Sequence, residues 1–123
     1  MPAVAVIGAS ADRRKFGNKA VRAYLHQGWT VYPVNPSAEL VEGLRAVPSV
    51  RELPEAVQRV LLYVPPEIGV ELLPEIARLT GVELWVNPGA ESDELLDKAR
   101  ELGLEPIQAC AIVDVGESPS AFS

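Results

Sequence analysis

The chain has 123 residues, among them 11 Lys and Arg, 17 Asp and Glu and a single cysteine, and its formal net charge is −6. Roughly 100–150 residues make one domain, and the acidic balance argues against nucleic acids and anionic membranes as partners, because both require broad clusters of Lys and Arg. One cysteine allows no internal disulfide, no basic region precedes an apolar stretch at the start, and no apolar run reaches the roughly 18 residues of a membrane span, so we expect a cytoplasmic protein.

Short apolar runs alternate with segments of helical periodicity, and Gly, Pro or Asn follows most of them. In chain order the predicted elements are a strand at 3–7, a helix at 18–27, a strand at 30–34, a short helix at 49–53, a strand at 60–64, a helix at 67–79, a strand at 82–86, a helix at 92–102 and a strand at 105–108. The run at 3–7 is apolar throughout, which is typical of a central parallel strand covered on both faces. Asn18 and Ser92 are placed to cap the first and last of the long helices.

This alternation predicts an α/β fold, with a single doubly wound parallel sheet of about five strands and helices on both of its faces. We expect one Rossmann-like domain over residues 1–123. Segment 110–115 is apolar enough to pack against the domain, whereas the tail at 116–123 is expected to fray.

Four loops follow the predicted strands, and right-handed crossovers bring all of them to the same edge of a parallel sheet. They are Gly8-Ala9-Ser10, Asn35-Pro36, Tyr63-Val64-Pro65-Pro66 and Asn87-Pro88-Gly89. A ligand crevice is expected at this edge, although Gly and Pro also end strands for purely conformational reasons.

The turn at 8–10 lies between a strand and a helix, which is the setting of a phosphate-binding turn. The Ser10 hydroxyl can donate to a phosphate oxygen, and Arg13, Arg14 and Lys15 follow directly. Residues 1–36 carry a balance of +4 and the rest of the chain −10, so one small positive region accompanies an acidic body. This favours a small anionic nucleotide as ligand, and the alternative is that the three cations form a solvated loop.

A dinucleotide fingerprint is incomplete here. Ser10 and Arg13 occupy the second and third glycine positions, and Asn35 stands where an acidic residue would hold a ribose. An NAD(P)-dependent or other nucleotide-dependent oxidoreductase that uses the same crevice is therefore the alternative rather than the leading hypothesis.

The ordered set of strand-end motifs, together with Val31-Tyr32-Pro33-Val34 and Trp85-Val86, resembles the stand-alone coenzyme A-binding domain proteins, which are similar to the N-terminal domain of the succinyl-CoA synthetase alpha subunit. The resemblance covers about residues 3–110. It implies a Rossmann-like fold that binds coenzyme A or an acyl-CoA along the strand ends. By the same resemblance, the diphosphate would be held by Gly8, Ala9 and Ser10 with Arg13, Arg14 or Lys15, the adenosine would be flanked by Val34, Asn35 and Pro36, and the pantetheine would run along Tyr63, Val64, Pro65, Asn87, Pro88 and Gly89.

Two departures from the family pattern bear on the ligand. Ser37, Ala38 and Glu39 follow the Asn-Pro pair where the pattern has a lysine near the 3′-phosphate, and Arg45 is a possible substitute of unknown direction. Near the last strand, family members often carry an Asp-Arg-Cys-like sequence. This chain has Gln108-Ala109-Cys110 there and keeps only the cysteine. That thiol either contacts coenzyme A, as in a mixed disulfide, or is a buried small hydrophobe.

No catalytic constellation accompanies these motifs. His26 is the only histidine and lies at the end of a predicted helix, where it complements the helix dipole, and no spacing of His, Cys and Asp suggests a metal site. We therefore expect a binding, carrier or regulatory module without chemistry of its own. A homodimer and a partner among acyl-CoA enzymes both remain open.

Overall fold

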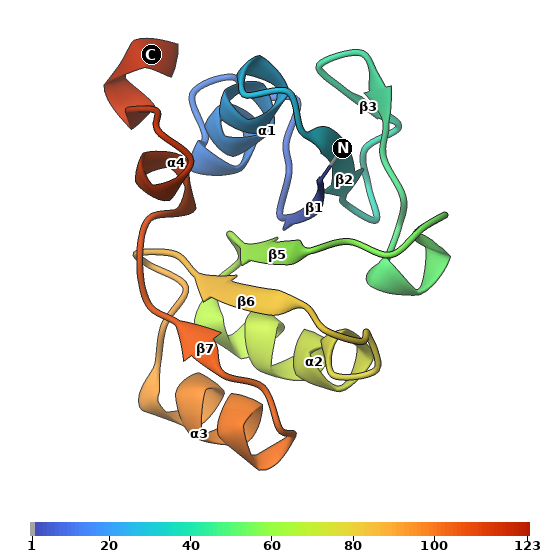
Figure 1. Ribbon diagram of the computed structural model, residues 1–123, viewed down its shortest axis with the longest axis vertical. Coiled ribbons are helices and arrows are strands. Elements are labelled where there is room, and N and C mark those ends of the chain that lie inside the picture. Colours follow the sequence, from blue (N-terminus) through green and yellow to red (C-terminus); the bar gives the residue numbers. More distant parts are fainter. Residues whose placement is uncertain (1) are drawn as a thin grey trace.

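Five parallel strands form the central sheet of the computed structural model, which describes residues 2–123 (Figure 1). They are β1 (Ala3–Ile7), β2 (Thr30–Val34), β5 (Arg59–Leu62), β6 (Glu83–Val86) and β7 (Pro106–Ile107). Their order across the sheet is β2-β1-β5-β6-β7, so the chain leaves β1 to one side for β2 and returns to the other side for β5. The predicted parallel α/β fold is confirmed, and the point at which the strand order reverses lies between β1 and β5.

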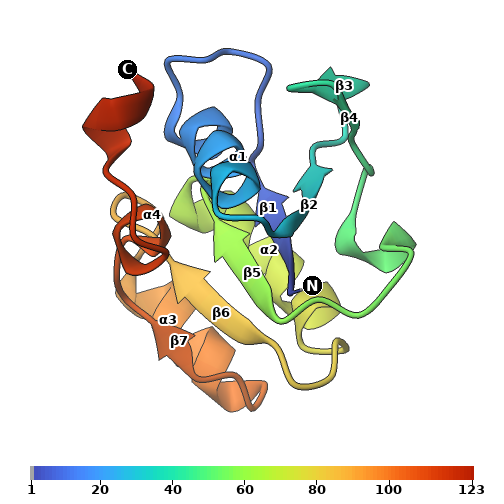
Figure 2. The same ribbon diagram turned by 45° about the horizontal axis from the view of Figure 1, so that its top comes forward.

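Helices cover both faces of the sheet, as Figures 1 and 2 show. Helices α1 (Phe16–His26) and α4 (Ala111–Asp114) pack on one face, and α2 (Pro66–Ile76) and α3 (Asp93–Glu101) pack on the other. Strand β1 contributes to both cores by alternation, because Val4 and Val6 face α1 whereas Ala3, Ala5 and Ile7 face α2 and α3. Within residues 2–123, none of the helices is long and apolar enough to cross a membrane.

A small hairpin, absent from the sequence prediction, extends the sheet beyond β2. Its strands are β3 (Leu40–Val41) and β4 (Leu44–Arg45), and its turn places Glu42 at φ +51° and Gly43 at φ +78°. Positive φ at both central residues is the geometry of a two-residue hairpin turn. Beyond β4, Val47 pairs with Val34 of β2, and this pairing attaches the hairpin to the main sheet. The short helix predicted nearby is present as a 3-10 turn, Val50–Glu52, with Ser49 as its cap.

Helix α1 begins earlier than its periodicity indicates. Lys15 occupies the N-cap position, and Asn18, predicted as the cap, is instead fully buried inside the first turn. The cap prediction is therefore wrong, because the Asn18 side chain is engaged in contacts with other segments rather than with the helix end.

The tail beyond Gly116 folds back onto α1, which corrects the expectation of a frayed end. Residues Pro119–Phe122 form a 3-10 turn, and Arg22 of α1 donates from Nη2 to the carbonyl oxygen of Phe122 at 2.6 Å. The Glu117 carboxylate accepts hydrogen bonds from His26 and Gln27 at the end of α1, and these bonds lower its pKa. Contacts with residues of α1 and its end, which lie 90 to 100 positions earlier in the sequence, hold this segment.

The amino-terminal edge of the sheet is held by one arginine. The guanidinium of Arg59 lies between the rings of Trp29 and Trp85, at 5.2 and 4.7 Å from their centroids. It also forms ion pairs with Glu83 at 2.9 Å and Asp114 at 2.8 Å, although its side chain is only 18% exposed. Arg59 thereby joins β5, β6 and α4.

Replacement of this arginine tests how much the fold depends on it. Arg59→Ala removes two stacking contacts and leaves two carboxylates without their cation, so we expect the free energy of unfolding to fall by about 2–4 kcal/mol in a urea titration. The control Arg78→Ala, at an exposed position after α2, should change it by less than about 0.5 kcal/mol. Equal stability of the two variants would show that the Arg59 contacts are dispensable.

Candidate functional site

The four strand-end loops converge on a cleft of about 580 Å³ above the ends of β1 and β5, which we call the turn cleft. It is lined by Gly8, Ser10, Lys15, Phe16, Gly17, Asn35, Tyr63, Val64, Pro65, Pro66, Pro88, Gly89 and Ala90. Residues far apart in the chain therefore share one site. It lies at the reversal of strand order, where ligands bind in open α/β sheets.

Two further pockets continue the turn cleft toward the hairpin. The apolar pocket, of about 260 Å³, shares Gly8, Asn35 and Val64 with the turn cleft. The rest of its lining is Ile7, Val34, Pro36, Pro48, Ser49, Val50, Ile68, Leu72 and Glu75. The hairpin pocket, of about 450 Å³, is lined by Asn35, Pro36, Ala38, Glu39, Leu40, Arg45, Ala46 and Pro48. Shared lining residues connect the three cavities into one groove.

Most of the ligand residues expected from the sequence line this groove, and the rest lie just outside it. Ala9 is fully buried in the core beneath α1, and Asn87 is buried at the end of β6. Asn87 donates to the carbonyl oxygens of Leu62 and Trp85 and accepts from the amide of Ala111 at 2.9 Å. Asn87 therefore holds the start of α4 against the strand ends and does not line the cleft.

The turn after β1 and the start of α1 approach each other at two glycines. A Cβ atom built on Gly17 would lie 2.2 Å from the carbonyl oxygen of Gly8, and one built on Gly8, whose φ is +89°, would lie 2.7 Å from the carbonyl oxygen of Tyr63. Only bare backbone fits at both positions. Helical periodicity does not indicate the role of Gly17, although a glycine in the first turn of a helix that follows such a loop is a usable signal.

The start of α1 is suited to hold an anion. No side chain caps this helix, and its first turn contains no acidic residue. Free amide groups and the positive end of the helix dipole therefore face the cleft beside Lys15. The Ser10 hydroxyl oxygen accepts from the amide of Asp12 at 3.0 Å, so its hydrogen is available to donate to a ligand.

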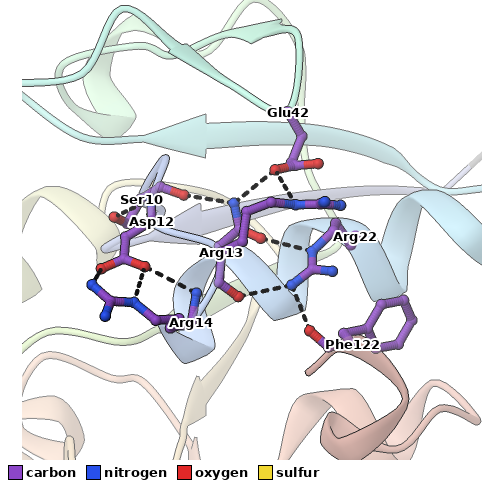
Figure 3. Close-up of polar contacts among 8 residues, drawn as sticks. Ser10, Asp12, Arg13, Arg14, Arg22, Glu42 and Phe122 are labelled. Atoms are coloured by element: carbon purple, nitrogen blue, oxygen red, sulfur yellow. Dashed lines mark hydrogen bonds and ion pairs between the residues drawn. The ribbon is translucent and has the colours of Figure 1, made fainter.

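The buried side chain of Asn18 connects the turn to the hairpin, because it bonds Ser10 and Glu42, two of the residues labelled in Figure 3. Its Nδ2 donates to the carbonyl oxygen of Ser10 at 2.8 Å and to Glu42 at 3.0 Å, while its Oδ1 accepts from Arg22 Nε at 2.7 Å. All hydrogen-bonding groups of this amide side chain are occupied. The network therefore positions the turn by contacts that do not involve the cleft.

Arg22 extends the same network to the loop and the tail. Its Nη2 donates to the carbonyl oxygen of Arg13 at 2.8 Å as well as to that of Phe122. The guanidinium also lies 5.6 Å from the centroid of the Phe122 ring. One side chain thus fixes the loop at 13 and the end of the chain together.

The three consecutive cations of the loop have different surroundings. Arg13 pairs with Glu42 at 3.2 Å, and Arg14 pairs with Asp12 at 3.1 Å. Hydrogen bonds from Arg14 lower the pKa of Asp12 to about 2, so this pair stays ionised at neutral pH. Within residues 2–123, Lys15 has no ion-pair partner, and it is the member of the three that lines the turn cleft.

Asn35 closes the other side of the turn cleft. Its Nδ2 donates to the carbonyl oxygen of Ala9 at 2.7 Å, and its Oδ1 accepts from the amide of Ser37 at 2.7 Å. The end of β2 is thereby tied to the turn after β1. Asn35 is an amide at the position where a dinucleotide fingerprint has a carboxylate, so the hydrogen bond of that carboxylate to the ribose is missing.

Tyr63 and Cys110 lie on the α1 side of the strand ends. The hydroxyl of Tyr63 is buried without a hydrogen-bond partner in the described residues, and burial raises its pKa, as does the neighbouring Cys110. Cys110 is half-buried at the start of α4 and lines none of the three cavities. Among residues 2–123, no group of three or more His, Cys, Asp and Glu is placed to hold a metal ion.

Comparison with known proteins gives one family for nearly the whole chain. A family model described as a CoA binding domain matches residues 2–116. The alpha subunit of the ADP-forming acetate–CoA ligase II of Pyrococcus furiosus is 40% identical over 73 residues, which are 58% of this chain and 16% of that subunit. The chain therefore corresponds to a small part of the curated relatives that it matches.

Solved structures of two kinds share the fold. A conserved hypothetical protein from Pyrococcus furiosus is 35% identical with a TM-score of 0.84, and the match covers 93% of this chain and 99% of that one. The dinucleotide forming acetyl-coenzyme A synthetase 1 of Ca. Korarchaeum cryptofilum, in complex with phosphate and ADP, is 30% identical with a TM-score of 0.72, and the match covers 85% of this chain and 25% of that one. The same fold thus occurs in a protein of similar size and within a larger synthetase.

The close approach of the two glycines predicts a steric effect at position 17. Gly17→Ala should lower the free energy of unfolding by about 3 kcal/mol or more, because the new methyl group collides with backbone that cannot rotate away. The matched control is Gly103→Ala, where φ is +84° but no atom lies within 4 Å of the added Cβ, so only a conformational cost of about 1–2 kcal/mol is expected. Denaturant titrations of both variants measure the difference, and a Gly17→Ala protein as stable as its control would contradict the steric interpretation.

Proposed function

Because the chain belongs to the CoA-binding domain family, we propose that it binds coenzyme A or an acyl-CoA in the groove formed by the turn cleft and the apolar pocket. The observation that carries the proposal is the convergence of four strand-end loops on an uncapped helix end with one free lysine, next to an apolar pocket. Coenzyme A combines these features, since it has a diphosphate, a flat adenine ring that suits the apolar pocket and a long, extended pantetheine arm.

In this proposal the diphosphate lies at the turn after β1. Gly8 and Gly17 leave the backbone bare, so phosphate oxygens can approach the amides of the turn and of α1. Ser10 donates its hydroxyl hydrogen, and Lys15 supplies the charge nearest the cleft. Arg13 and Arg14 act from outside the groove, where their ion pairs with Glu42 and Asp12 hold the loop in shape, and the buried Ala9 shapes the turn from below.

The two remaining parts of coenzyme A have separate places in the groove. Val34, Asn35 and Pro36 border the apolar pocket, which we assign to the adenosine. The pantetheine arm runs through the turn cleft along Tyr63, Val64, Pro65, Pro88 and Gly89, and Asn87 acts indirectly by holding the end of β6. Contact between the thiol and Cys110 remains part of the proposal, and it requires the arm to reach the α4 side of Tyr63.

We further propose that the protein is a binding, carrier or regulatory module without chemistry of its own. The imidazole of His26 is bonded to Glu117 at the far end of α1, away from the groove. Two of the similar proteins named above are a subunit of an acetate–CoA ligase and an acetyl-coenzyme A synthetase, so an enzyme that makes or uses acyl-CoA is the proposed partner, and a homodimer is the other assembly. The single cysteine supports a cytoplasmic location.

Calorimetric titration tests the ligand and its place. The unmodified protein should bind coenzyme A and give no response to NAD or NADP at the same concentration. Ser10→Asp should abolish binding, because it places a carboxylate against the diphosphate, and Lys15→Gln should weaken it about 5–10-fold through the loss of one charge-assisted contact.

The control for these variants is Lys98→Gln on α3, which lies outside all three cavities and should keep the affinity of the unmodified protein. No heat at millimolar coenzyme A would rule out the proposed ligand. Full affinity in Ser10→Asp would instead rule out the assigned turn.

A further inference from the structure

One side chain holds both the loop after β1 and segment 117–123. Arg22, half-buried on α1, donates from Nη2 to the carbonyl oxygen of Arg13 at 2.8 Å and to that of Phe122 at 2.6 Å (Figure 3). Its Nε donates to the Oδ1 atom of Asn18 at 2.7 Å. The two hydrogens of Nη2 are therefore shared between the loop and segment 117–123.

Two bonds from α1 fix the backbone of the loop that carries the groups proposed to bind the diphosphate. Asn18 donates to the carbonyl oxygen of Ser10 at 2.8 Å, and Arg22 donates to that of Arg13. Ser10 and Lys15, at the two ends of this loop, line the turn cleft. Neither Asn18 nor Arg22 lines any of the three cavities, so both act on a ligand through the position of the loop.

Segment 117–123 lies shallowly on α1. Its 3-10 turn contains no buried residue. Two side chains attach it, since the Phe122 ring lies 5.6 Å from the Arg22 guanidinium and the Glu117 carboxylate is bonded to the end of α1. Elements with little buried surface open at a lower free energy than the core, so we expect this segment to leave α1 while the sheet stays folded.

We propose that Arg22 is a positioning residue that couples the docking of segment 117–123 on α1 to ligand binding at the turn after β1. The inference rests on the coenzyme A binding proposed above. With the segment docked, the carbonyl oxygen of Phe122 restricts the guanidinium, so the bonds to Asn18 and Arg13 form with a smaller loss of side-chain entropy. When the segment leaves, the loop is held less firmly, and ordering it around an anion costs more.

Coupling of this kind is reciprocal, so coenzyme A stabilises the docked segment by the same factor by which the docked segment strengthens binding. The site therefore has a means of regulation outside the groove. A partner that binds segment 117–123 in its undocked form lowers the affinity for coenzyme A without entering any of the three cavities.

Long-range charge effects and the coupling predict different results for three substitutions. Glu117→Ala removes a negative charge, so electrostatics alone would leave the affinity for an anion unchanged or raise it. The coupling predicts weaker binding, because the variant loses the attachment of the segment to the end of α1. Phe122→Ala removes the second attachment without a change of charge, and Arg22→Lys keeps the charge but loses the planar set of donors.

Calorimetric titration with coenzyme A measures the effect on affinity. Glu117→Ala, Phe122→Ala and Arg22→Lys should each weaken binding about fivefold. The double variant Arg22→Lys/Phe122→Ala should bind no more weakly than Arg22→Lys, because the segment acts through this arginine. The control is Val113→Ala, at an exposed apolar position of α4 outside the three cavities, which should keep the affinity of the unmodified protein. The two segment variants test the coupling even if Arg22→Lys does not fold.

Hydrogen exchange of the segment measures the same coupling from the other side. The amide of Ala121 donates to the carbonyl oxygen of Ser118 at 2.9 Å, so its exchange reports on the 3-10 turn. Saturating coenzyme A should slow the exchange of peptides that cover residues 116–123 about fivefold in the unmodified protein. In Arg22→Lys, coenzyme A should leave this exchange unchanged.

The other outcomes overturn the coupling or the proposed function. Additive losses of affinity in the double variant would show that Arg22 and the segment act separately, and the coupling would be wrong. Full affinity in both segment variants, or exchange of the segment that does not respond to bound coenzyme A, would also refute the coupling and leave coenzyme A binding intact. If the unmodified protein does not bind coenzyme A, the proposed function fails, and the coupling fails with it.

Discussion

The contact on which the site depends is the approach of the first turn of α1 to the carbonyl oxygen of Gly8. A side chain at Gly17 would push the helix away from β1. With glycine there, the free amides of the helix end lie directly at the turn, and Asn18 is brought within reach of Ser10 and the hairpin. One van der Waals distance between two backbone segments therefore sets the positions of the loop, the hairpin and the helix dipole.

The charged side chains near this contact mainly hold the loop in shape, and few of them are free to bind a ligand. The amino-terminal region is rich in cations, yet Arg13, Arg14 and Arg22 are bound to groups of the protein itself. Their contacts hold the backbone from Asp12 to Lys15 in place, while Lys15 stays free. A loop ordered in this way loses little conformational entropy when an anion binds, which favours affinity more than additional mobile cations would.

The sequence predicts the parts of this protein that depend on local pattern. The five strands, the three long helices and the convergence of the four loops follow from apolar runs, periodicity and the geometry of parallel sheets. Contacts between distant residues are not predictable in this way. The hairpin strands have two residues each, too few for a period to show, and the hydrogen bond of Arg22 to Phe122 joins residues 100 positions apart. Asn87 follows a strand, and this pattern does not distinguish a ligand contact from the bonds that Asn87 makes to buried backbone.

The stacking of Arg59 between Trp29 and Trp85 has a consequence for spectroscopy. These are the two tryptophans of the chain, and both lie against one guanidinium near the amino-terminal ends of the strands. The groove lies at the opposite ends of the strands and is lined by neither indole. The tryptophan fluorescence of this protein therefore reports on the packing at the amino-terminal edge of the sheet, away from the groove.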